Sequence, residues 1–540
     1  MKKYIYLIGV ICTLFSFTGC KDYLTAPEPG VVLLEDFFTS KEAVVQTATG
    51  CYAPLMWEFQ HTYCSEWFIG DIVSDDALKG GQSTTDMGAA YDMENWKTTA
   101  SNELLLDFYR AQYQGIGRCN LGIRYVTPMA TDTAFSAALK NRVLGEMYFL
   151  RAYYYFRLVR VFGDVPLVLE VMDSEDQWKQ ERVSVSVVYK QIIEDLKFAQ
   201  SHLQLKSAMD KEDLGRATKG AAQAMLLKVY LYMASPYWNS KVGGSATDYA
   251  KQAQNWGDSV ILSNEYVLVD SVDYGKMFFD IEEENGNESV FEIQYAAVPW
   301  GDYNEGFGFT AGSFTQRLVR SRSSKLTDGD SGWGFNHPTQ SLFDEFEAGD
   351  MRRDISILTP ASSQITNATQ EIYLGSAYLN RKYGWYGHKL DHDSRGPLNN
   401  KQIRYADVLL MHAEAAQLAG DAGTATADLN KVRQRASMAA YPGYTFTTKT
   451  PATGDALKDA IRHERRVELA MEGHRWFDLV RWYGENGLDT YMNDRANGYP
   501  STESDEAKAQ MGTFIAGKHE IFPIPSEEIE LNPMTQNNGY

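Results

Sequence analysis

The sequence has few cysteines, too few for a disulfide-stabilised fold. Five cysteines occur among 540 residues, and two of them, Cys12 and Cys20, lie near the N-terminus. The remaining three are an odd number, so they cannot form a complete disulfide framework. Either one bridge forms among Cys51, Cys64 and Cys119, or all three are buried thiols; we favour the thiols.

The short motifs of several large enzyme classes are also missing. The sequence has no GxSxG, no P-loop and no HExxH, which argues against a serine hydrolase elbow, a P-loop phosphate site and the zinc site of common metalloproteases. Histidine and aspartate cluster in YGHKLDHDS, residues 386–394, but their spacing matches no standard metal site. Carboxylates are plentiful, and plenty alone does not indicate the acid/base pair of a glycosidase. We therefore expect no metal, no cofactor and no catalytic residue.

Net positive charge and long apolar runs are absent as well. The chain has 51 Lys and Arg against 71 Asp and Glu, a formal net charge of −20 at pH 7. Such an acidic chain is a poor candidate for binding nucleic acid or an anionic membrane surface. After residue 20, no stretch is apolar enough to cross a bilayer. Hydrophobic and charged contents of 44% and 23% indicate instead an ordinary globular protein with a large core.

The chain begins with MKKYIYLIGVICTLFSFTGC. Lys2 and Lys3 precede an apolar run that is too short for a mature transmembrane helix, so residues 1–19 are predicted to be a secretory signal. The ending FTGC is similar to the cleavage site of bacterial lipoproteins, which makes Cys20 the predicted lipid attachment point. Residues 20–35 would form a lipidated tether, the only membrane attachment. The alternative is that Cys20 merely lies near a conventional cleavage site.

Four pairs of segments carry apolar residues at helical spacing. The pairs span about residues 36–125, 136–203, 216–263 and 403–438. Ser40 is placed to cap the first helix, and Gly163 with Pro166 should end a long helix in the second pair. In the last pair a turn at Gly420 is followed by Thr424 as the predicted cap. Repeated helix-turn-helix pairs predict a mainly α fold, a tetratricopeptide-like helical-repeat scaffold.

Two regions break this helical pattern. Residues 66–100 are rich in glycine and aspartate and predict a long loop. Residues 264–402 predict long irregular loops with a few short strands, one of them in ESVFEIQY. Irregular segments of this length in a compact domain are usually functional, so we expect the ligand-binding part at about 264–402, helped by the first loop.

The segment DALKDAIRHERRVELAMEGHRWFDLVRW, residues 455–482, combines helical spacing with many charges. Opposite charges recur three residues apart and therefore share a face of a helix. The predicted pairs at this spacing are Arg465–Glu468, Glu472–Arg475 and Asp478–Arg481, and a fourth pair, His474–Asp478, has a spacing of four. Because apolar residues lie between the charges, we predict one helix whose ion pairs are partly buried and structural.

Five strings of this chain resemble sequences of one known family. They are GEMYFLRAYYYFRLVRVFGDVPL, IRYADVLLMHAEAAQLAG, LNKVRQRA, ERRVELAMEGHRWFDLVRW and the C-terminal EIFPIPSEEIELNPMTQNNGY. They resemble the SusD/RagB family of outer-membrane nutrient-binding lipoproteins. The resemblance implies a single domain over residues 36–540, with a C-terminal family segment at 455–540 and the tetratricopeptide-like scaffold.

The resemblance also implies a function. A SusD-like lipoprotein, anchored in the outer membrane and facing the cell exterior, captures nutrient, usually oligosaccharide, without catalysis. It delivers this ligand to a SusC-like TonB-dependent transporter. Two alternatives stay open: a secreted glycan-degrading enzyme on an α-helical frame, and a SusD-like protein that binds peptides.

A sugar ring is held best by a flat aromatic side chain with a few planar hydrogen-bonding groups around it. Aromatic residues on the predicted loops are therefore the candidate ligand-binding residues. They are Trp96, Trp300, Tyr303, Phe307 and Trp385. Trp96 and Trp300 fall in loops that match regions where family members place ligand-stacking aromatics. For any single one of these residues the alternative is packing under a long loop.

Overall fold

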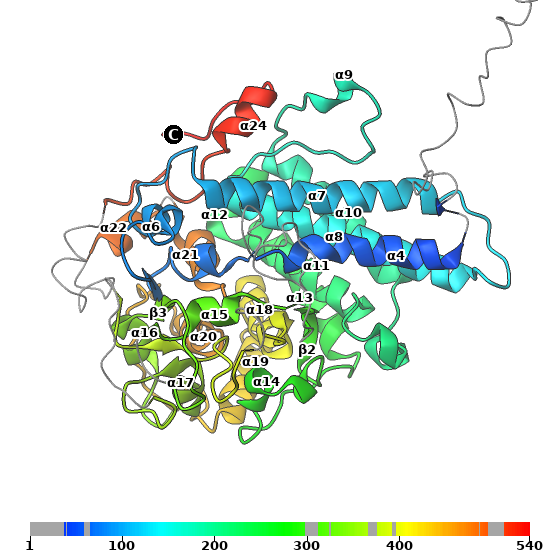
Figure 1. The fold of residues 1–540 in the computed structure, drawn as a ribbon. Coiled ribbons are helices and arrows are strands. Elements are labelled where there is room, and N and C mark those ends of the chain that lie inside the picture. Colours follow the sequence, from blue (N-terminus) through cyan, green and yellow to red (C-terminus); the bar gives the residue numbers. More distant parts are fainter. Residues whose placement is uncertain are drawn as a thin grey trace, which may run out of the picture.

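Helices dominate the computed structural model (Figure 1). The structure describes residues 37–38, 40–58, 65–296, 312–322, 326–365, 375–390, 396–484, 486–494 and 512–540. Eight helices form the repeat scaffold. They are α4 (Lys41–Tyr52), α7 (Glu103–Val126), α8 (Ala137–Phe162), α10 (Val185–His202), α11 (Lys219–Ala234), α13 (Ala246–Ile261), α18 (Tyr405–Ala419) and α19 (Ala422–Arg435).

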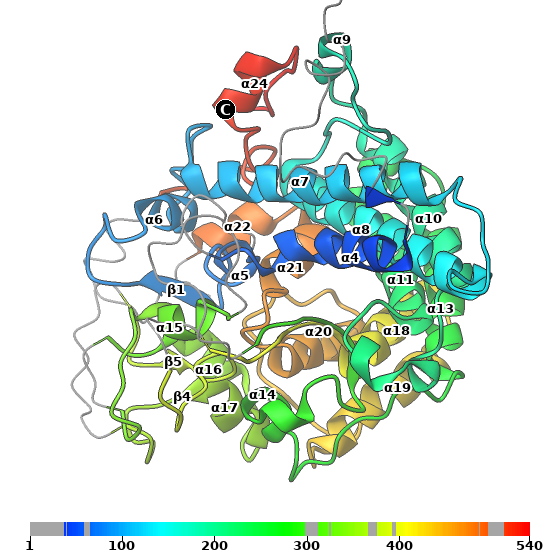
Figure 2. The same ribbon diagram turned by 45° about the vertical axis from the view of Figure 1, so that its right-hand side comes forward.

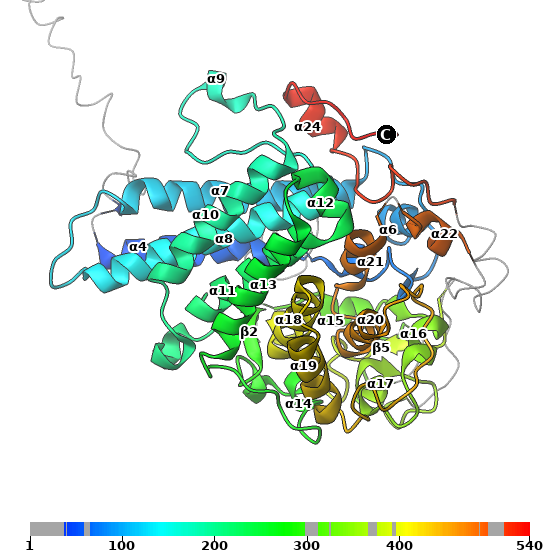
Figure 3. The ribbon, with the colours of Figure 1, turned by 180° about the vertical axis from the view of Figure 1, so that it is seen from behind.

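Each of these helices packs against the next one along the chain, from α4 to α19. Figures 1 and 3 show the resulting stack from the front and from behind. The four predicted pairs are therefore α4 with α7, α8 with α10, α11 with α13, and α18 with α19. The mainly α, tetratricopeptide-like fold predicted from the sequence is confirmed.

The helix ends follow the sequence signals, with one correction. The Ser40 side chain accepts a hydrogen bond from the Ala43 amide at 3.2 Å, and α8 ends before Gly163. Gly420 ends α18 in the left-handed conformation, at φ +90°. Thr424 is not a cap, because α19 already begins at Ala422; the Asp421 side chain instead accepts from the Thr424 amide at 3.1 Å.

Close approach between neighbouring helices depends on small residues. A Cβ atom added at Gly115 of α7 would lie 2.2 Å from the Tyr154 ring of α8. The alanine-rich α11 is buried from Gly220 to Ala234, because α8, α10, α13 and α18 all contact it. Small side chains thus bring the backbones together over the whole scaffold.

Short strands join distant parts of the chain into three two-stranded antiparallel sheets. The pairs are β1 (Ala77–Gly80) with β3 (Phe335–Pro338), β2 (Ser289–Ile293) with β6 (Asn400–Arg404), and β4 (Ile357–Leu358) with β5 (Leu379–Asn380). The strand predicted in ESVFEIQY is β2. Its partner β6 runs directly into α18, so this sheet fixes the irregular region to the scaffold.

The remaining helices lie mostly in the other half of the molecule (Figures 1 and 2). They include α5 (Trp67–Gly70), α6 (Gly88–Glu94), α9 (Glu175–Trp178), α12 (Pro236–Val242), α14 (Lys276–Phe279), α15 (Thr315–Val319), α16 (Gln340–Glu345), α17 (Met351–Ser356), α20 (Ala456–Glu468), α21 (Arg475–Tyr483), α22 (Leu488–Asn493) and α24 (Ser526–Leu531). No described helix is both long and apolar enough to span a membrane.

The prediction of one long loop at residues 66–100 is wrong. This segment contains α5, β1 and α6, and much of it is buried. Asp75 and Asp76 form ion pairs there with Arg466 at 3.0 and 2.8 Å. A carboxylate whose ion-pair partner is almost 400 residues away looks like a loop residue in the sequence, because the spacing of nearby residues cannot predict that partner.

The single charged helix predicted at residues 455–482 is also wrong. The chain forms α20 and α21, and the turn between them contains Met471 and Gly473 at φ +62° and +76°. Of the three pairs predicted at a spacing of three, only Asp478–Arg481 forms, at 2.8 Å. Glu472 lies in the turn before α21, so the break separates it from Arg475. Arg465 and Glu468 share α20 but pair elsewhere, Arg465 with Asp407 and Asp478 and Glu468 with arginines of other segments.

The predicted burial and structural role of these charges nevertheless agree with the structure. Glu468 pairs with Arg352, Arg404 and Arg435. All four side chains are at most 4% exposed. The network therefore joins α20 to α17, β6 and α19 rather than linking neighbours along one helix.

Cys51 and Cys119 are buried and carry free thiols. This agrees with the predicted thiols for these two residues. Cys64 lies outside the described residues.

Candidate functional site

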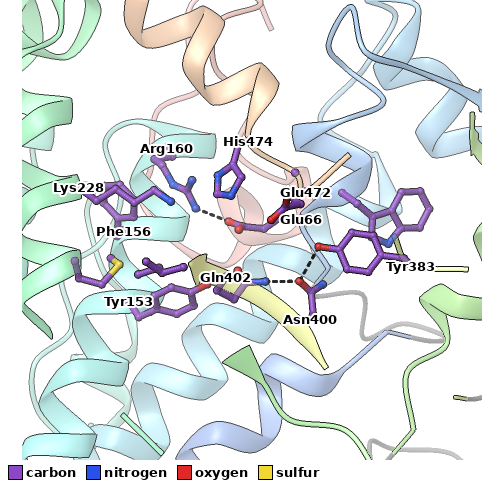
Figure 4. Close-up of a pocket in the computed structure, with 14 residues that line it drawn as sticks. Glu66, Tyr153, Phe156, Arg160, Lys228, Tyr383, Asn400, Gln402, Glu472 and His474 are labelled. Carbon is purple, nitrogen blue, oxygen red and sulfur yellow. Dashed lines mark hydrogen bonds and ion pairs between the residues drawn. The ribbon is translucent and has the colours of Figure 1, made fainter. Parts of the chain in front are cut away.

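A small polar cavity lies inside the molecule, where α8, α11, β6 and the turn between α20 and α21 meet (Figure 4). Its volume is about 20 Å³, room for about one water molecule. The lining residues are Glu66, Trp67, Tyr153, Phe156, Arg160, Met225, Lys228, Tyr383, Asn400, Gln402, Ile403, Glu472, Gly473 and His474. A site for an organic ligand usually encloses several hundred cubic ångströms, so this cavity cannot hold a sugar.

The charged groups of the cavity have partners, either in the cavity, as for Glu66 and Arg160, or behind it, as for Lys228 with Asp407 and Glu472 with Arg404. Glu66 accepts from Arg160, and Gln402 donates to Asn400 at 2.8 Å, as Figure 4 shows. Burial alone would raise the pKa of Glu66, but Arg160 and Arg157 lower it below its usual value. Burial and the nearby Lys228 lower the pKa of His474 to about 4. Glu66 is therefore ionised and His474 neutral at pH 7, and Glu66 lacks the raised pKa of a general acid.

A second polar centre is the buried carboxylate of Glu58, which is 4% exposed. It accepts hydrogen bonds from five residues. They are Ser65 at 2.8 Å, Tyr295 at 2.8 Å, Ser313 at 2.9 Å, the Phe314 amide at 2.7 Å, and Thr315 through its hydroxyl at 2.9 Å and its amide at 3.1 Å. Glu58 and Ser65 flank residues 59–64, while Tyr295 and Ser313 flank residues 297–311. One carboxylate thus holds both ends of two segments.

A third segment ends at the same place. Ser313 and Gly396 exchange backbone hydrogen bonds of 2.8 and 2.9 Å, and Gly396 follows residues 391–395. A Cβ atom at Gly396 would lie 1.4 Å from the Gln316 side-chain oxygen, so a larger residue there would require the Gln316 side chain to move. We call Glu58, Tyr295, Ser313, Thr315 and Gly396 the loop base.

Three of the predicted ligand-binding residues belong to the segment that starts and ends at the loop base. Trp300, Tyr303 and Phe307 lie outside the described residues, as does the predicted lipidation site Cys20. The loop base holds the two flanks of residues 297–311 close together. No local pattern pointed to Glu58, because an isolated glutamate next to a tryptophan looks like any surface glutamate.

Trp96 occupies a different environment from the one predicted. Its side chain is 7% exposed, and its ring lies 5.3 Å from that of Trp476 and 5.7 Å from that of His519, which stacks on it. Phe514 packs edge-on at 5.0 Å. With its faces covered by protein, Trp96 has the role of a core residue in this conformation and cannot offer a stacking surface.

Trp385 is half-buried on a turn that leads toward the loop base. Its ring stacks on His388 at 4.4 Å with an angle of 5° between the planes. The turn is held by Arg320, which donates to the carbonyl oxygens of Gly384, Trp385 and His388. Among the described residues, the Trp385 indole N–H has no hydrogen-bond partner. The neighbouring Tyr386 is 5% exposed and packs in the core.

Among the described residues, no group of three or more histidine, cysteine, aspartate or glutamate side chains is placed to hold a metal ion. Asp391, His392 and Asp393 lie outside those residues. The segments that start and end at the loop base are the candidate site, because one of them, residues 297–311, contains three of the predicted ligand-binding residues.

Two family models match the chain. The model described as SusD family matches residues 357–540, and the model described as "Starch-binding associating with outer membrane" matches residues 24–231. A similar protein is SusD-like protein P2 of Formosa agariphila, which is 25% identical over 565 residues and is covered completely, as is this chain.

Solved structures show the same fold. A laminarin-binding SusD-like protein is 25% identical with a TM-score of 0.75, over 93% of this chain and 100% of the other. Surface glycan-binding protein A from Bacteroides thetaiotaomicron, in complex with laminarihexaose, is 23% identical with a TM-score of 0.73 over the same shares. With both family models, the full-length relative and these folds in agreement, the chain belongs to the SusD/RagB family.

Proposed function

We propose that this protein captures oligosaccharide at the outside of the outer membrane and passes it to a SusC-like TonB-dependent transporter, without catalysis. The observation that carries the proposal is the full-length similarity, at 25% identity, to a solved laminarin-binding protein. The family model for the N-terminal half, described as starch-binding and associating with the outer membrane, supports the same role and location.

The loop base supports a position for the ligand. Glu58 holds the flanks of residues 297–311 through Tyr295 and Ser313, and this segment carries three aromatic residues. We propose Trp300, Tyr303 and Phe307 as the stacking residues, with Trp385 on the adjoining turn. Trp96 is left out of the proposed site because protein rings cover it. Scaffold helices, in this proposal, position the loops.

A glycan array followed by calorimetry tests the proposal on protein that lacks residues 1–20. Each lost ring should cost about 0.5–1.5 kcal/mol, so the double variant Trp300→Ala, Tyr303→Ala should bind its glycan roughly 5- to 150-fold more weakly. The matched control is Trp178→Ala, which removes an exposed tryptophan from another surface and should leave affinity unchanged. Melting temperatures of both variants should stay near wild type.

Three results would contradict the proposal in different ways. Wild-type affinity in the double variant would move the site away from residues 297–311. Release of products from the bound glycan would favour the glycan-degrading enzyme. Binding of peptides with no glycan bound on the array would favour peptide as the transported nutrient.

The membrane attachment is a separate proposal, based on the Gly19–Cys20 junction after the apolar leader. A lipid on Cys20 would anchor the protein, so Cys20→Ala should move it from the membrane fraction to the soluble one. The assay is fractionation in high salt from cells that lack the partner transporter. Protein that still sediments with outer membranes under these conditions would refute a lipid anchor at Cys20.

A further inference from the structure

Cys51 of α4 and Cys119 of α7 are fully buried in the scaffold. Cys51 lies in the last turn of α4, and Cys119 lies in the second half of α7. The two helices pack side by side (Figures 1 and 2). Neither cysteine belongs to the loop base or to the proposed glycan site, so the function proposed above gives this pair no role.

Contacts between α4 and α7 set the register of the two helices. A Cβ atom added at Gly122 of α7 would lie 3.0 Å from the Thr47 methyl carbon of α4. The Arg118 side chain donates to the Gly50 carbonyl oxygen at 2.9 Å. The later residue of α4 thus meets the earlier residue of α7, so the two helices are antiparallel.

This register places the two thiols opposite each other. Cys51 is one turn after Thr47 along α4, and Cys119 is one turn before Gly122 along α7. The Cys51 thiol donates to the Thr47 carbonyl oxygen at 3.3 Å. Burial, together with a hydrogen bond with Cys51, raises the pKa of the Cys119 thiol well above its usual value. The two side chains are therefore in contact inside the core, and the Cys119 thiol is protonated at neutral pH.

Two thiols in contact need only one oxidation step to become a disulfide bond. Disulfides form and persist outside the cytoplasm and are rare inside it. The family model that covers both cysteines, at residues 24–231, is described as associating with the outer membrane. The leader at residues 1–19 predicts export. The chain would therefore fold in an oxidising compartment.

We propose that Cys51 and Cys119 form a disulfide bond when the exported chain folds, and that the thiols in this structure are the reduced form of the pair. The inference rests on the proposed function in one respect, the location outside the cytoplasm. The bond joins α4 to α7 and closes a loop over residues 52–118. This loop contains Glu58 of the loop base and the buried Asp75 and Asp76. A bond across so long a loop stabilises the fold by restricting the unfolded chain.

The bond forms by exchange with a disulfide-bonded thiol oxidoreductase of the cell envelope. One cysteine thiolate attacks a sulfur of that disulfide and gives a mixed disulfide, and the second thiolate then displaces the sulfur of the oxidant. The S–S bond between Cys51 and Cys119 forms and the S–S bond of the oxidant breaks. The two thiol protons of the protein pass to the two sulfurs of the oxidant. Because the folded pair is fully buried, the exchange precedes the packing of α4 on α7.

Peptide mapping without reduction tests the proposal on the full chain from the outer-membrane fraction. Cells are quenched in denaturant with N-ethylmaleimide, which blocks every free thiol. We expect one linked pair of peptides that contain Cys51 and Cys119, lighter by two hydrogen atoms than the separate peptides with free thiols. Maleimide on both cysteines of the exported protein, or a bond from either one to Cys64, would overturn the inference.

Refolding in vitro separates the geometry of the pair from the location of the protein. Protein that lacks residues 1–20, made in a reducing cytoplasm, should carry both thiols free and keep them when oxidised glutathione is added to the folded state. After unfolding, refolding with oxidised glutathione should link Cys51 to Cys119 in most molecules. Refolded protein without this bond would overturn the inference.

Failure of the inference and failure of the proposed function give different results. Free thiols in exported protein that still binds glycan would refute the bond alone. A bonded pair in exported protein that binds no glycan would refute the glycan proposal alone. A native chain found only in the cytoplasm would refute the proposed location and, with it, the bond in cells.

Alanine variants, refolded with oxidised glutathione, test the contribution of the bond to stability. Cys51→Ala and Cys119→Ala should each lower the melting temperature by about 2–5 °C. The double variant should lose little more than either single variant, because the first substitution already removes the bond. Cys64→Ala is the matched control and should leave melting unchanged. Losses that simply add in the double variant would indicate two independent thiols and overturn the inference. Glycan affinity of the double variant should equal that of wild type.

Discussion

α11 and α20 are both buried helices, but chemically different surfaces hold them in place. α11 is buried along almost its whole length, mostly through alanine, leucine, methionine and tyrosine. α20 buries six ionisable side chains among its ten buried residues. α11 packs between neighbouring scaffold helices, whereas the charges of α20 pair with segments that are far away in the sequence.

The difference follows from the kind of segment that each helix packs against. Scaffold helices meet neighbours along their length, so apolar contact is sufficient. α20 faces short irregular segments that have little apolar surface of their own. Arg466 reaches Asp75, Asp76 and Glu345, and Glu468 reaches three arginines. Directional ion pairs can fix such segments where extended apolar packing is absent.

The largest effect is expected from breaking the ion pairs of α20. Glu468→Ala would leave Arg352, Arg404 and Arg435 without a shared carboxylate in a buried site. Burial alone would raise the pKa of Glu468, but these arginines hold it well below its usual value, so the native group is ionised. Removing one partner of a buried ion pair typically costs about 3–5 kcal/mol. Denaturant unfolding monitored by circular dichroism measures the loss.

The exposed Glu282→Ala is the control for this variant and should change the unfolding free energy by less than about 0.5 kcal/mol. A loss below about 1 kcal/mol for Glu468→Ala would mean that water replaces the carboxylate at little cost. In that case the contrast between α20 and α11 would not be energetic.

A smaller loss should follow from an apolar truncation in α11. Leu226 is fully buried, and Leu226→Ala removes transfer free energy and leaves a cavity, at a cost of about 3 kcal/mol. No charge is involved, so the loss should be the same at pH 6 and pH 9. Unfolding curves at the two pH values check this. A loss that changed strongly with pH would show that scaffold packing is coupled to the charged network.

The smallest effect is expected in the pH dependence of the free energy of unfolding, through His463 of α20. Burial alone would lower the pKa of His463, but hydrogen bonds to Glu345 and Glu347 raise it from 6.5 to about 9. When a group has a higher pKa in the folded state than in the unfolded state, binding its proton stabilises the folded state. This stabilisation is complete at pH values below the pKa of the unfolded state. That contribution, about 1–3 kcal/mol, should fade as the pH rises from 6.5 through 9.

Comparing wild type with His463→Gln isolates this contribution. The variant should be less stable at pH 6 and nearly equal to wild type at pH 9.5, as measured by denaturant unfolding at each pH. A difference in stability that is the same at both pH values would show that the native ring is not charged.

Sequence reasoning predicted the scaffold well and the irregular half poorly. The caps at Ser40 and Gly420 and the strand at ESVFEIQY follow from local signals, and the structure contains them. The candidate site was predicted less well, since Trp96 is a core residue and Glu58 was overlooked. Both errors arise because a residue's exposure depends on what the rest of the chain places over it.

By itself, the sequence determined the helix pairs, their order and the family, because helical periodicity and capping act over a few residues. The tertiary structure alone decided which charges pair, which aromatic rings are covered, and which segments start and end together. Asp75 with Arg475, and Glu58 with Ser313, are partners separated by 400 and 255 residues. Such partners come into contact only when the scaffold has brought distant segments to the same place. The spacing of neighbouring residues in the sequence therefore cannot predict these contacts.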